Sequence, residues 1–178
     1  MDVRAFGAVI GLSKGDGFAP ITGGIKGCVS IGIATSIKPI HIHEIATTCC
    51  INLKNTTGKD SNTMGMSKYT VSKSAYVGYG SIYPQLAELT GFSEEDCEKV
   101  KNAIMHMLDN DVSAARPAGS MILSELHWWK HNCSSGQYNI AKVHRSMSVA
   151  PKDNFPYYEV NKNYELKDLE HEVYNFMD

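Results

Sequence analysis

Two successive helices are predicted by PQLAELTGFSEEDCEKVKNAIMHML, residues 84–108. Pro84 suits a first helical turn, and Gly91 suits the residue after a helix, where a left-handed backbone is common. Ser93 then caps a second helix, with Asp96 three residues further on in an approximate capping box. Apolar residues recur beyond the cap at three- and four-residue spacing: Cys97, Val100, Ile104, Met107 and Leu108. The stretch therefore predicts a short helix followed by a longer, amphipathic one.

Strand patterns surround these helices on both sides. From Ile25 onward β-branched residues dominate, and residues 40–43 alternate apolar and polar side chains with the period of a strand. Residues 52–62 are polar, and strand-forming residues resume from Ser67 to Ile82. We therefore expect a β-hairpin arm at about residues 46–72. After the helices, residues 120–130 predict another strand.

The order of these elements, strand, strand, inserted arm, strand, helix and strand, predicts an α+β fold. It is compatible with a partial RRM-like or ferredoxin-like palm, in which helices cover one face of a sheet and the hairpin arm is an insertion. Phe6 to Leu12 is apolar and predicts a buried strand of this sheet. We assign the palm and its arm to residues 1–131.

Residues 132–178 form a C-terminal extension in this division of the chain. Near its end, apolar residues recur at roughly helical spacing: Leu166, Leu169, Val173 and Phe176. The pattern indicates an amphipathic helix from Tyr164 to Phe176.

Composition describes an ordinary globular protein of 178 residues, with 43% hydrophobic and 20% charged residues. No apolar run approaches the about 20 residues that a membrane helix needs, and the N-terminus has no signal pattern. The five cysteines are odd in number and irregularly spaced, which suits a reducing compartment. We therefore expect a cytoplasmic protein that makes no membrane contact.

Charge is spread unevenly along the chain, whose net charge is −2. Residues 151–178 carry three Lys and seven acidic residues, whereas the remaining 150 residues carry 14 basic and 12 acidic ones. A body this weakly basic does not depend on non-specific attraction to phosphates. Any contact with nucleic acid must therefore come from the local placement of a few cations.

Residue types that carry catalysis or hold metals lack the spacing that such sites need. His41 and His43 share one face of a predicted strand, and His127, His131 and Cys133 cluster near a later one. Zinc sites usually pair Cys or His at tight, repeated spacings, and no such double pair is present. No Gly-x-Ser-x-Gly elbow, catalytic Cys signature or P-loop occurs either. We expect no enzyme activity, no catalytic residue, no metal and no cofactor.

The arm is the strongest candidate for a binding surface. Lysines and tyrosines are interleaved along it: Lys54, Lys59, Lys68, Lys73, Tyr69, Tyr76 and Tyr79. Cations that follow a backbone and rings that stack on bases are what proteins use to bind single-stranded RNA. The alternative interpretation is a solvated hairpin with ordinary cross-strand tyrosines.

Five stretches resemble, in the right order, one known family. They are DVRAFGAV (residues 2–9), SIKPI (36–40), TMG (63–65), LAELTGFSEED (86–96) and SAAR (113–116). Together they resemble the backbone subunit of type I-C CRISPR Cascade complexes, over roughly residues 2–131. The order and spacing of the stretches make the resemblance specific, although no single motif is diagnostic.

The resemblance implies a right-hand-shaped subunit that stacks along a guide RNA, with a palm on the RNA backbone and the arm as a thumb. It implies that Thr22 and Gly23 lie near the guide RNA. It also implies that Arg116, from the motif Ser-Ala-Ala-Arg, contacts a phosphate or a neighbouring subunit; the alternative is a structural arginine after the helix. The implied partners are other Cascade subunits, copies of the backbone subunit and guide RNA, without catalysis.

The chain also departs from the family. The resemblance implies an N-terminal truncation, since we expect the family's usual opening strand to have no counterpart before Met1. A sheet without that strand leaves backbone groups unpaired, so we expect either a strand accepted from a partner or a fragment of a longer protein. Cations common in the family are replaced by Met66, Ser67 and Val77, and Thr48 stands where one is often seen. These replacements weaken guide RNA binding.

Two functions therefore stay open. The first is a non-catalytic, backbone-like protein that interacts with guide RNA and/or other Cascade subunits. The second is a solitary, truncated homologue, for example phage-encoded, that mimics the backbone subunit and blocks Cascade assembly as an anti-CRISPR. The kept helices combined with lost cations fit the second function.

Overall fold

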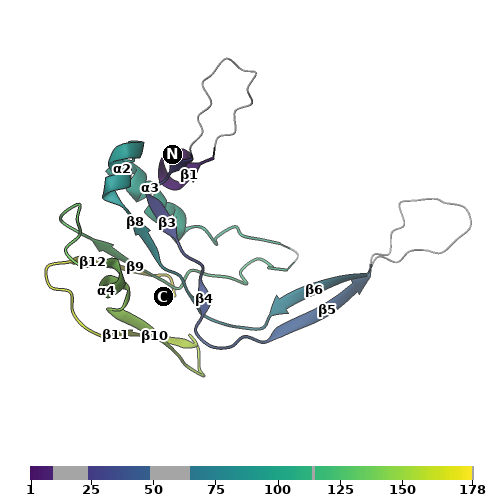
Figure 1. Ribbon diagram of the computed structural model, residues 1–178. Coiled ribbons are helices and arrows are strands. Elements are labelled where there is room, and N and C mark those ends of the chain that lie inside the picture. Colours follow the sequence, from purple (N-terminus) through teal and green to yellow (C-terminus); the bar gives the residue numbers. More distant parts are fainter. Residues whose placement is uncertain (10–23, 49–64, 114, 178) are drawn as a thin grey trace, which may run out of the picture.

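The computed structural model describes residues 1–9, 24–48, 65–113 and 115–177, and it has an α+β fold (Figure 1). The helices are α1 (Asp2–Phe6), α2 (Pro84–Thr90), α3 (Glu94–Met105) and α4 (Ile140–His144). The strands are β1 (Gly7–Ala8), β2 (Ile25–Lys26), β3 (Val29–Ile31), β4 (Thr35–Ser36), β5 (Ile42–Thr48), β6 (Gly65–Val71), β7 (Tyr76–Val77), β8 (Gly80–Ile82), β9 (Glu125–Lys130), β10 (Met147–Pro151), β11 (Tyr158–Lys162) and β12 (Glu170–Asn175). The predicted α+β class is confirmed.

The two helices predicted from residues 84–108 are confirmed, with their end signals. Pro84 opens α2, and Gly91 closes it in the left-handed region at φ 70°. Ser93 caps α3: its hydroxyl accepts a hydrogen bond from the Asp96 amide, and the Asp96 carboxylate accepts one from the Ser93 amide. The reciprocal pair satisfies two amides that the first helical turn leaves without partners.

A long antiparallel ribbon forms the centre of the molecule. Strands β3, β4 and β5 run outward, and β6, β7 and β8 return, so that β3 pairs with β8, β4 with β7 and β5 with β6. Between β3 and β4 the outgoing chain advances four residues, from Ile31 to Thr35, whereas the returning chain moves three, from Gly80 to Val77. The extra residue is a bulge, and bulges increase the twist of a ribbon.

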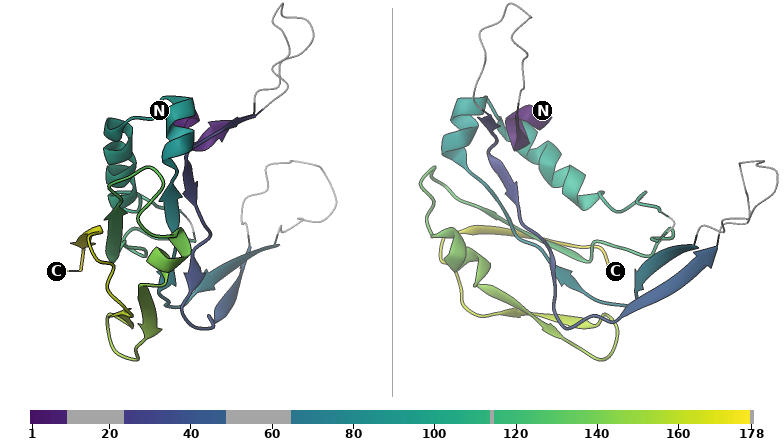
Figure 2. Two further views of the ribbon diagram at one scale, coloured as in Figure 1. Left: turned by 60° about the vertical axis from the view of Figure 1, so that its left-hand side comes forward. Right: turned by 45° about the vertical axis from the view of Figure 1, so that its right-hand side comes forward.

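The outer part of the ribbon projects from the rest of the molecule as an arm made of β5 and β6 (Figure 1). Both views in Figure 2 show this blue and teal hairpin extending away from the helices. Its strands pair from Ile42 with Val71 to Thr48 with Gly65. The hairpin expected around the polar segment is therefore present, although residues 49–64 lie outside the described part of the chain.

The amphipathic helix predicted from Tyr164 to Phe176 is wrong. Residues 170–175 form strand β12, which pairs antiparallel with β9 from Glu170 with Lys130 to Asn175 with Glu125. In β12 the residues at 172 and 174 are half-buried and alternate with exposed ones, so burial has a period of two. The apolar spacing resembled a helix, but backbone pairing with β9 outweighs that weak local preference.

The strand predicted from Phe6 to Leu12 also needs correction. Phe6 is the last residue of helix α1, and only Gly7 and Ala8 form a strand, which pairs with β2. Ala5 of the helix is fully buried. The apolar run therefore begins in a helix, whose first turn carries Asp2 and whose last turn carries Arg4.

Strands β9 and β12 form a ribbon whose two faces have different neighbours. One face meets α3, where Lys101 binds Glu172 at 3.1 Å and lies 5.7 Å from the centre of the Trp128 ring.

An ion pair joins the first helix to α3: Arg4 of α1 binds Asp96, at the start of α3, at 2.9 Å. Asp96 is only 2% exposed, so this ion pair ties α1 to the helical layer.

Full burial is restricted to a few side chains among the described residues. The apolar ones are Ala5, Cys28, Val100, Val143 and Leu169.

No described helix is both long and apolar enough to span a bilayer. The described strands form six two-stranded ladders, so a large share of the backbone edges and apolar side chains lies at the surface.

Candidate nucleic-acid interface

In the described part of the arm, Lys68 is available for a ligand. Lys68 lies in β6 opposite Ile45 and forms no ion pair with a described residue. Tyr69, next to it, lies on the other face of the ribbon, where its hydroxyl donates to Glu44 at 3.2 Å. The carboxylate of Glu44 makes that second face less suitable for phosphates.

Lys73 lies where the arm meets the body, and its charge already has a partner. Its Nζ atom stands 4.3 Å from the centre of the Tyr157 ring, which belongs to the segment between β10 and β11. A cation over a ring face at this distance is attracted electrostatically. The contact anchors the base of the arm to the C-terminal part of the chain, and RNA would have to compete with it.

Tyr76 and Tyr79 point to different sides of the central ribbon. Tyr76 lies in β7 opposite Ser36 and is 48% exposed. Tyr79 is three residues further along, and its ring stacks on His144 of α4, with centroids 4.7 Å apart. The two tyrosines therefore do not form one stacking platform.

Arg116 closes a turn after α3. Its amide donates to the Ser113 backbone oxygen at 3.0 Å, and its guanidinium binds Asp111 at 3.1 Å. The Arg116 side chain is still 49% exposed. The ion pair fits the structural alternative, and the exposed half of the guanidinium leaves room for a phosphate.

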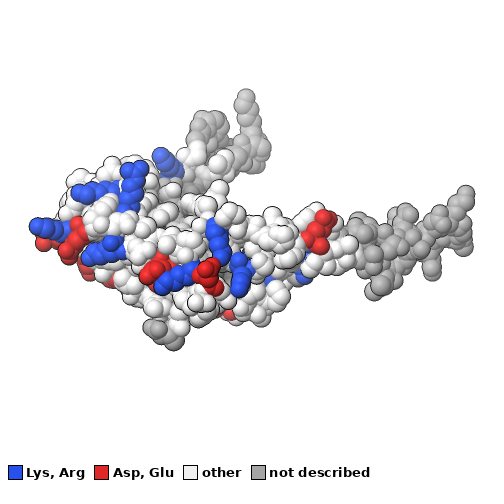
Figure 3. All heavy atoms as spheres, turned by 90° about the horizontal axis from the view of Figure 1, so that it is seen from below, with Lys and Arg blue, Asp and Glu red and all other residues white. Residues whose placement is uncertain are grey.

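Four residues expected at the RNA lie outside the described part of the chain: Thr22, Gly23, Lys54 and Lys59. Those that are described, Lys68, Lys73, Tyr76 and Arg116, come from the arm, the arm base, the ribbon and the turn after α3. No hydrogen bond, ion pair or ring contact joins any two of these four described residues. Figure 3 shows one face on which Lys and Arg side chains are interspersed with Asp and Glu, without a continuous basic band over its described part.

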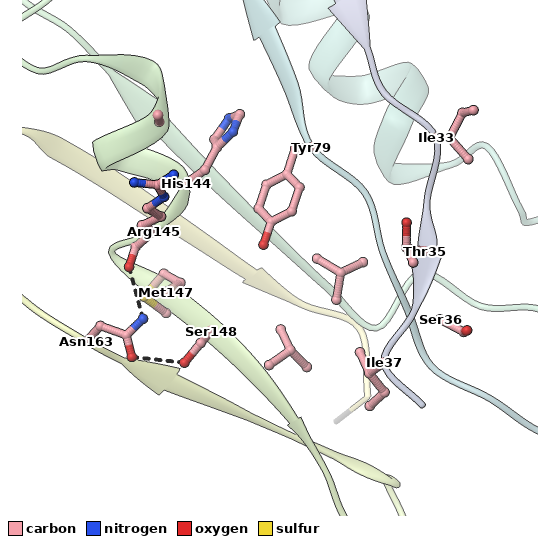
Figure 4. Close-up of a pocket in the computed structure, with 13 residues that line it drawn as sticks. Ile33, Thr35, Ser36, Ile37, Tyr79, His144, Arg145, Met147, Ser148 and Asn163 are labelled. Atoms are coloured by element: carbon pink, nitrogen blue, oxygen red, sulfur yellow. Dashed lines mark hydrogen bonds between the residues drawn. The ribbon is translucent and has the colours of Figure 1, made fainter. Parts of the chain in front are cut away.

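A groove that the sequence did not signal lies between the ribbon and α4–β10 (Figure 4). Tyr79 and His144 point toward each other at one end of it. At the other, Asn163 donates to the Arg145 backbone oxygen and accepts from the Ser148 hydroxyl, each at 2.9 Å. Its residues come from segments more than 60 positions apart, and residues 132–163 carried few local signals.

The second face of the β9–β12 ribbon carries a chain of polar groups. Glu125 accepts from Tyr158 of β11 at 2.9 Å and from His127 Nε2 at 3.1 Å. Because that carboxylate only accepts, neutral His127 carries its proton on Nε2, and Nδ1 accepts from His171 Nε2 at 3.1 Å. The ring of Trp129 stacks on His171 at 4.7 Å.

Two pKa values respond to these surroundings. Burial, the neighbouring His127 and the charge of Lys162 lower the pKa of His171. Burial and the hydrogen bond to the Glu125 carboxylate raise the pKa of Tyr158. Both shifts favour the neutral forms of His171 and Tyr158, and the hydrogen bonds of this face join β9 to β11 and β12.

Metal ligands do not converge in the described part of the chain, where no three His, Cys, Asp or Glu side chains meet in a metal-binding arrangement. His41 and His43 are neighbours with ring centroids 4.7 Å apart, and His127 and His171 form the second pair. The absence of metal, cofactor and catalytic residues stays a prediction.

Comparison with known proteins places the chain in a family. No match was found among curated proteins. The family model described as CRISPR-associated protein Cas7 matches residues 1–172, nearly the whole chain, including the strands β9 to β11 that follow the stretches of sequence resemblance and the first half of β12. The chain therefore belongs to the CRISPR-associated protein Cas7 family.

Proposed function

We propose that this chain is a non-catalytic, cytoplasmic backbone subunit of a type I-C CRISPR Cascade complex, which binds guide RNA and other Cascade subunits. Membership of the Cas7 family over residues 1–172 is the observation that carries the proposal. In this proposal residues 1–131 form the RRM-like palm, the hairpin of β5 and β6 is its thumb, and residues 132–178 are an extension. The projecting arm supports an RNA-binding role, since its Lys68 forms no ion pair with a described residue.

The described residues supply unequal shares of the proposed RNA contact. Lys68 and exposed Tyr76 need no rearrangement to meet a phosphate and a base. Lys73 and Arg116 each give up an existing contact, with Tyr157 and Asp111 respectively, before they meet RNA in full. We therefore assign the larger share of the contact to Lys68 and Tyr76.

A second candidate function is an anti-CRISPR that mimics the backbone subunit and blocks Cascade assembly. The observation that favours it is the internal use of Lys73 and Arg116, two of the cations expected at the RNA. Neutral Ser67 and Val77 at ribbon positions also leave few cations for phosphates. A mimic needs the protein-binding surface of the family and little RNA affinity.

Co-purification with type I-C Cascade proteins, with and without guide RNA, separates the two functions. A backbone subunit is expected to co-assemble only when guide RNA is present, with an affinity that falls steeply as salt rises. Replacing both Lys68 and Tyr76 by Ala is expected to weaken RNA binding at least tenfold. The matched control is Lys99→Ala, which removes an exposed lysine from α3, away from the arm.

The two outcomes contradict different proposals. Capture of one Cascade protein without RNA, together with loss of complex formation, would overturn the subunit and support the mimic. RNA-dependent assembly would exclude the mimic. Equal loss of RNA binding in the Lys68/Tyr76 double variant and in the Lys99→Ala control would show that these two residues have no special part in the contact.

A further inference from the structure

Strand β10 has an open edge, which its hydrogen bonds with β11 reveal. Asn163 donates to Ser146 at 2.8 Å just before the paired segment, and Lys152 donates to Tyr157 at 3.0 Å just after it. In an antiparallel pair the bonded positions recur every second residue. Residues 146, 148, 150 and 152 therefore bond toward β11, whereas the amides and carbonyls of Met147 and Val149 face away from it.

No described group pairs with these outward amides and carbonyls. These amides and carbonyls lie along the groove between β10 and the central ribbon (Figure 4). The groove has a volume of about 580 Å³. Three consecutive residues of β10 line it, 147 to 149, so it is the edge of the strand rather than one face that borders the groove.

The opposite wall is one face of the central ribbon. Thr35 and Val77 lie directly opposite each other and so share a face. Ile37 and Tyr79 are each two residues further along their strands and point the same way. Ile33, near the same wall, is 94% exposed. A largely apolar, partly exposed face thus stands across from a strand edge that has no backbone partner among the described residues.

We propose that this groove holds an extended strand of another Cascade protein, which pairs with β10 through Met147 and Val149 and lays alternate apolar side chains on the ribbon face. The proposal rests on the proposed function for the identity of the partner. Unpaired edge groups are specific for a strand, because a strand offers amides and carbonyls at the spacing that β10 presents.

The charge of the groove adds a feature of the partner strand. Arg145 is the one lysine or arginine among the lining residues, which include no Asp or Glu, and it forms no ion pair with a described residue. A carboxylate on the incoming strand near Arg145 would complement it. A single cation is a poor match for the regularly spaced phosphates of RNA, which favours a protein strand over nucleic acid.

Val149→Pro tests the pairing directly. Proline removes the outward amide of Val149 without removing a bond to β11, and prolines are tolerated on the edges of sheets. The matched control is Val160→Pro, since Val160 lies opposite Val149 and its amide faces the other edge of the same ribbon. Capture of each variant by purified type I-C Cascade proteins is measured with guide RNA present, after circular dichroism and urea unfolding have compared their folds.

We expect Val149→Pro to weaken capture at least tenfold and Val160→Pro to leave it within twofold of the wild type. Capture of both variants at the wild-type level overturns the strand pairing and leaves the proposed function standing. Failure of the wild-type chain to be captured overturns the proposed function, and the pairing falls with it.

Amide hydrogen exchange provides a second measurement that does not depend on a variant. In the chain alone, the amides of Ser148 and Ala150 are expected to exchange slowly and those of Met147 and Val149 quickly. In the assembled complex, exchange at Met147 and Val149 is expected to slow at least tenfold. Unchanged exchange at these two amides, or the same slowing by single-stranded RNA alone, overturns the proposal.

Discussion

Helix α3 with the β9–β12 ribbon and the central ribbon from β3 to β8 are built from similar lengths of chain but differ in how they use their side chains. In the first region Lys101 of α3 joins the helix to β12 through Glu172 and to β9 through the ring of Trp128. In the second, backbone pairing supplies the order, while Ile31 and Ile33 remain 57% and 94% exposed. We infer from this difference that side-chain contacts in the α3 region stabilise the fold, whereas the exposed side chains of the central ribbon are available to contact partners.

The largest effect is expected from Lys101→Met, which keeps the apolar stem but removes the charge. The Lys101 side chain is 8% exposed, and its loss leaves Glu172 and Glu98 without their cation. Because Glu98 and Glu172 are 50% and 35% exposed, water screens the carboxylates that lose their cation, and we expect the free energy of unfolding to fall by about 1.5 kcal/mol, measured by urea denaturation. Lys99→Met is the control: it removes an exposed ion pair with Glu95 from the same helix and is expected to leave the urea midpoint nearly unchanged. Equal effects would show that α3 is no more tightly held than the surface.

A smaller effect is expected from Ser93→Ala, which removes the cap of α3. The hydroxyl of Ser93 is the acceptor for the Asp96 amide at 3.2 Å, and alanine leaves that amide without it. We expect a loss of about 1 kcal/mol in thermal or urea unfolding. Ser135→Ala, an exposed loop position, serves as the matched control and is expected to change stability by less than about 0.5 kcal/mol. A cap variant as stable as this control would contradict the role of the capping box.

Acidification is expected to have a still smaller effect, through His171. Its pKa in the folded chain is lowered by burial, His127 and Lys162, so the unfolded chain takes up the proton first as pH falls. The stability that neutral His171 contributes is therefore present above its ordinary pKa of 6.5 and is lost below it. The urea concentration at the unfolding midpoint should decrease as the pH is lowered from 7.5 to 5.5. His171→Gln should make this dependence of the midpoint on pH weaker. A steeper slope in the variant would contradict this sign.

The smallest effect is expected where the arm meets the body. Lys73→Met removes the cation from the Tyr157 ring, and at this exposed position the loss should be about 0.5 kcal/mol. A cycle of Lys73→Met, Tyr157→Leu and the double variant isolates the coupling between the two side chains. Additive effects of the two changes would show that the arm base is not held by this contact.

Local signals predicted the elements that depend on neighbouring residues. Pro84, Gly91 and the Ser93 capping box set the bounds of α2 and α3 before any tertiary contact is considered. The period-two pattern around residues 40–43 likewise indicated a strand that is present in β5. The prediction was wrong at residues 164–176, since apolar spacing without a cap does not separate a helix from a strand whose partner in β9 lies 40 to 50 residues away.

The sequence predicted which residue types belong to the candidate site, but it did not predict which of their side chains are free to contact a ligand. Lys68 and Lys73 are equivalent in sequence, yet only Lys73 meets a ring from the distant segment between β10 and β11. The sequence did not predict the groove for the same reason, because Tyr79 and His144 meet only after the ribbon packs beside α4. Contacts between distant segments decide which side chains are occupied and which face a ligand.

The amino-acid sequence by itself determined the two capped helices, the hairpin and the family resemblance, because these follow from signals spaced by a few residues. Tertiary structure alone decided that residues 170–175 form a strand, that Lys73 and Arg116 are partly engaged, and that β10 presents an open edge to an apolar face. The physical reason is that backbone pairing and charge contacts join segments far apart in the chain, and their free energy exceeds weak local preferences.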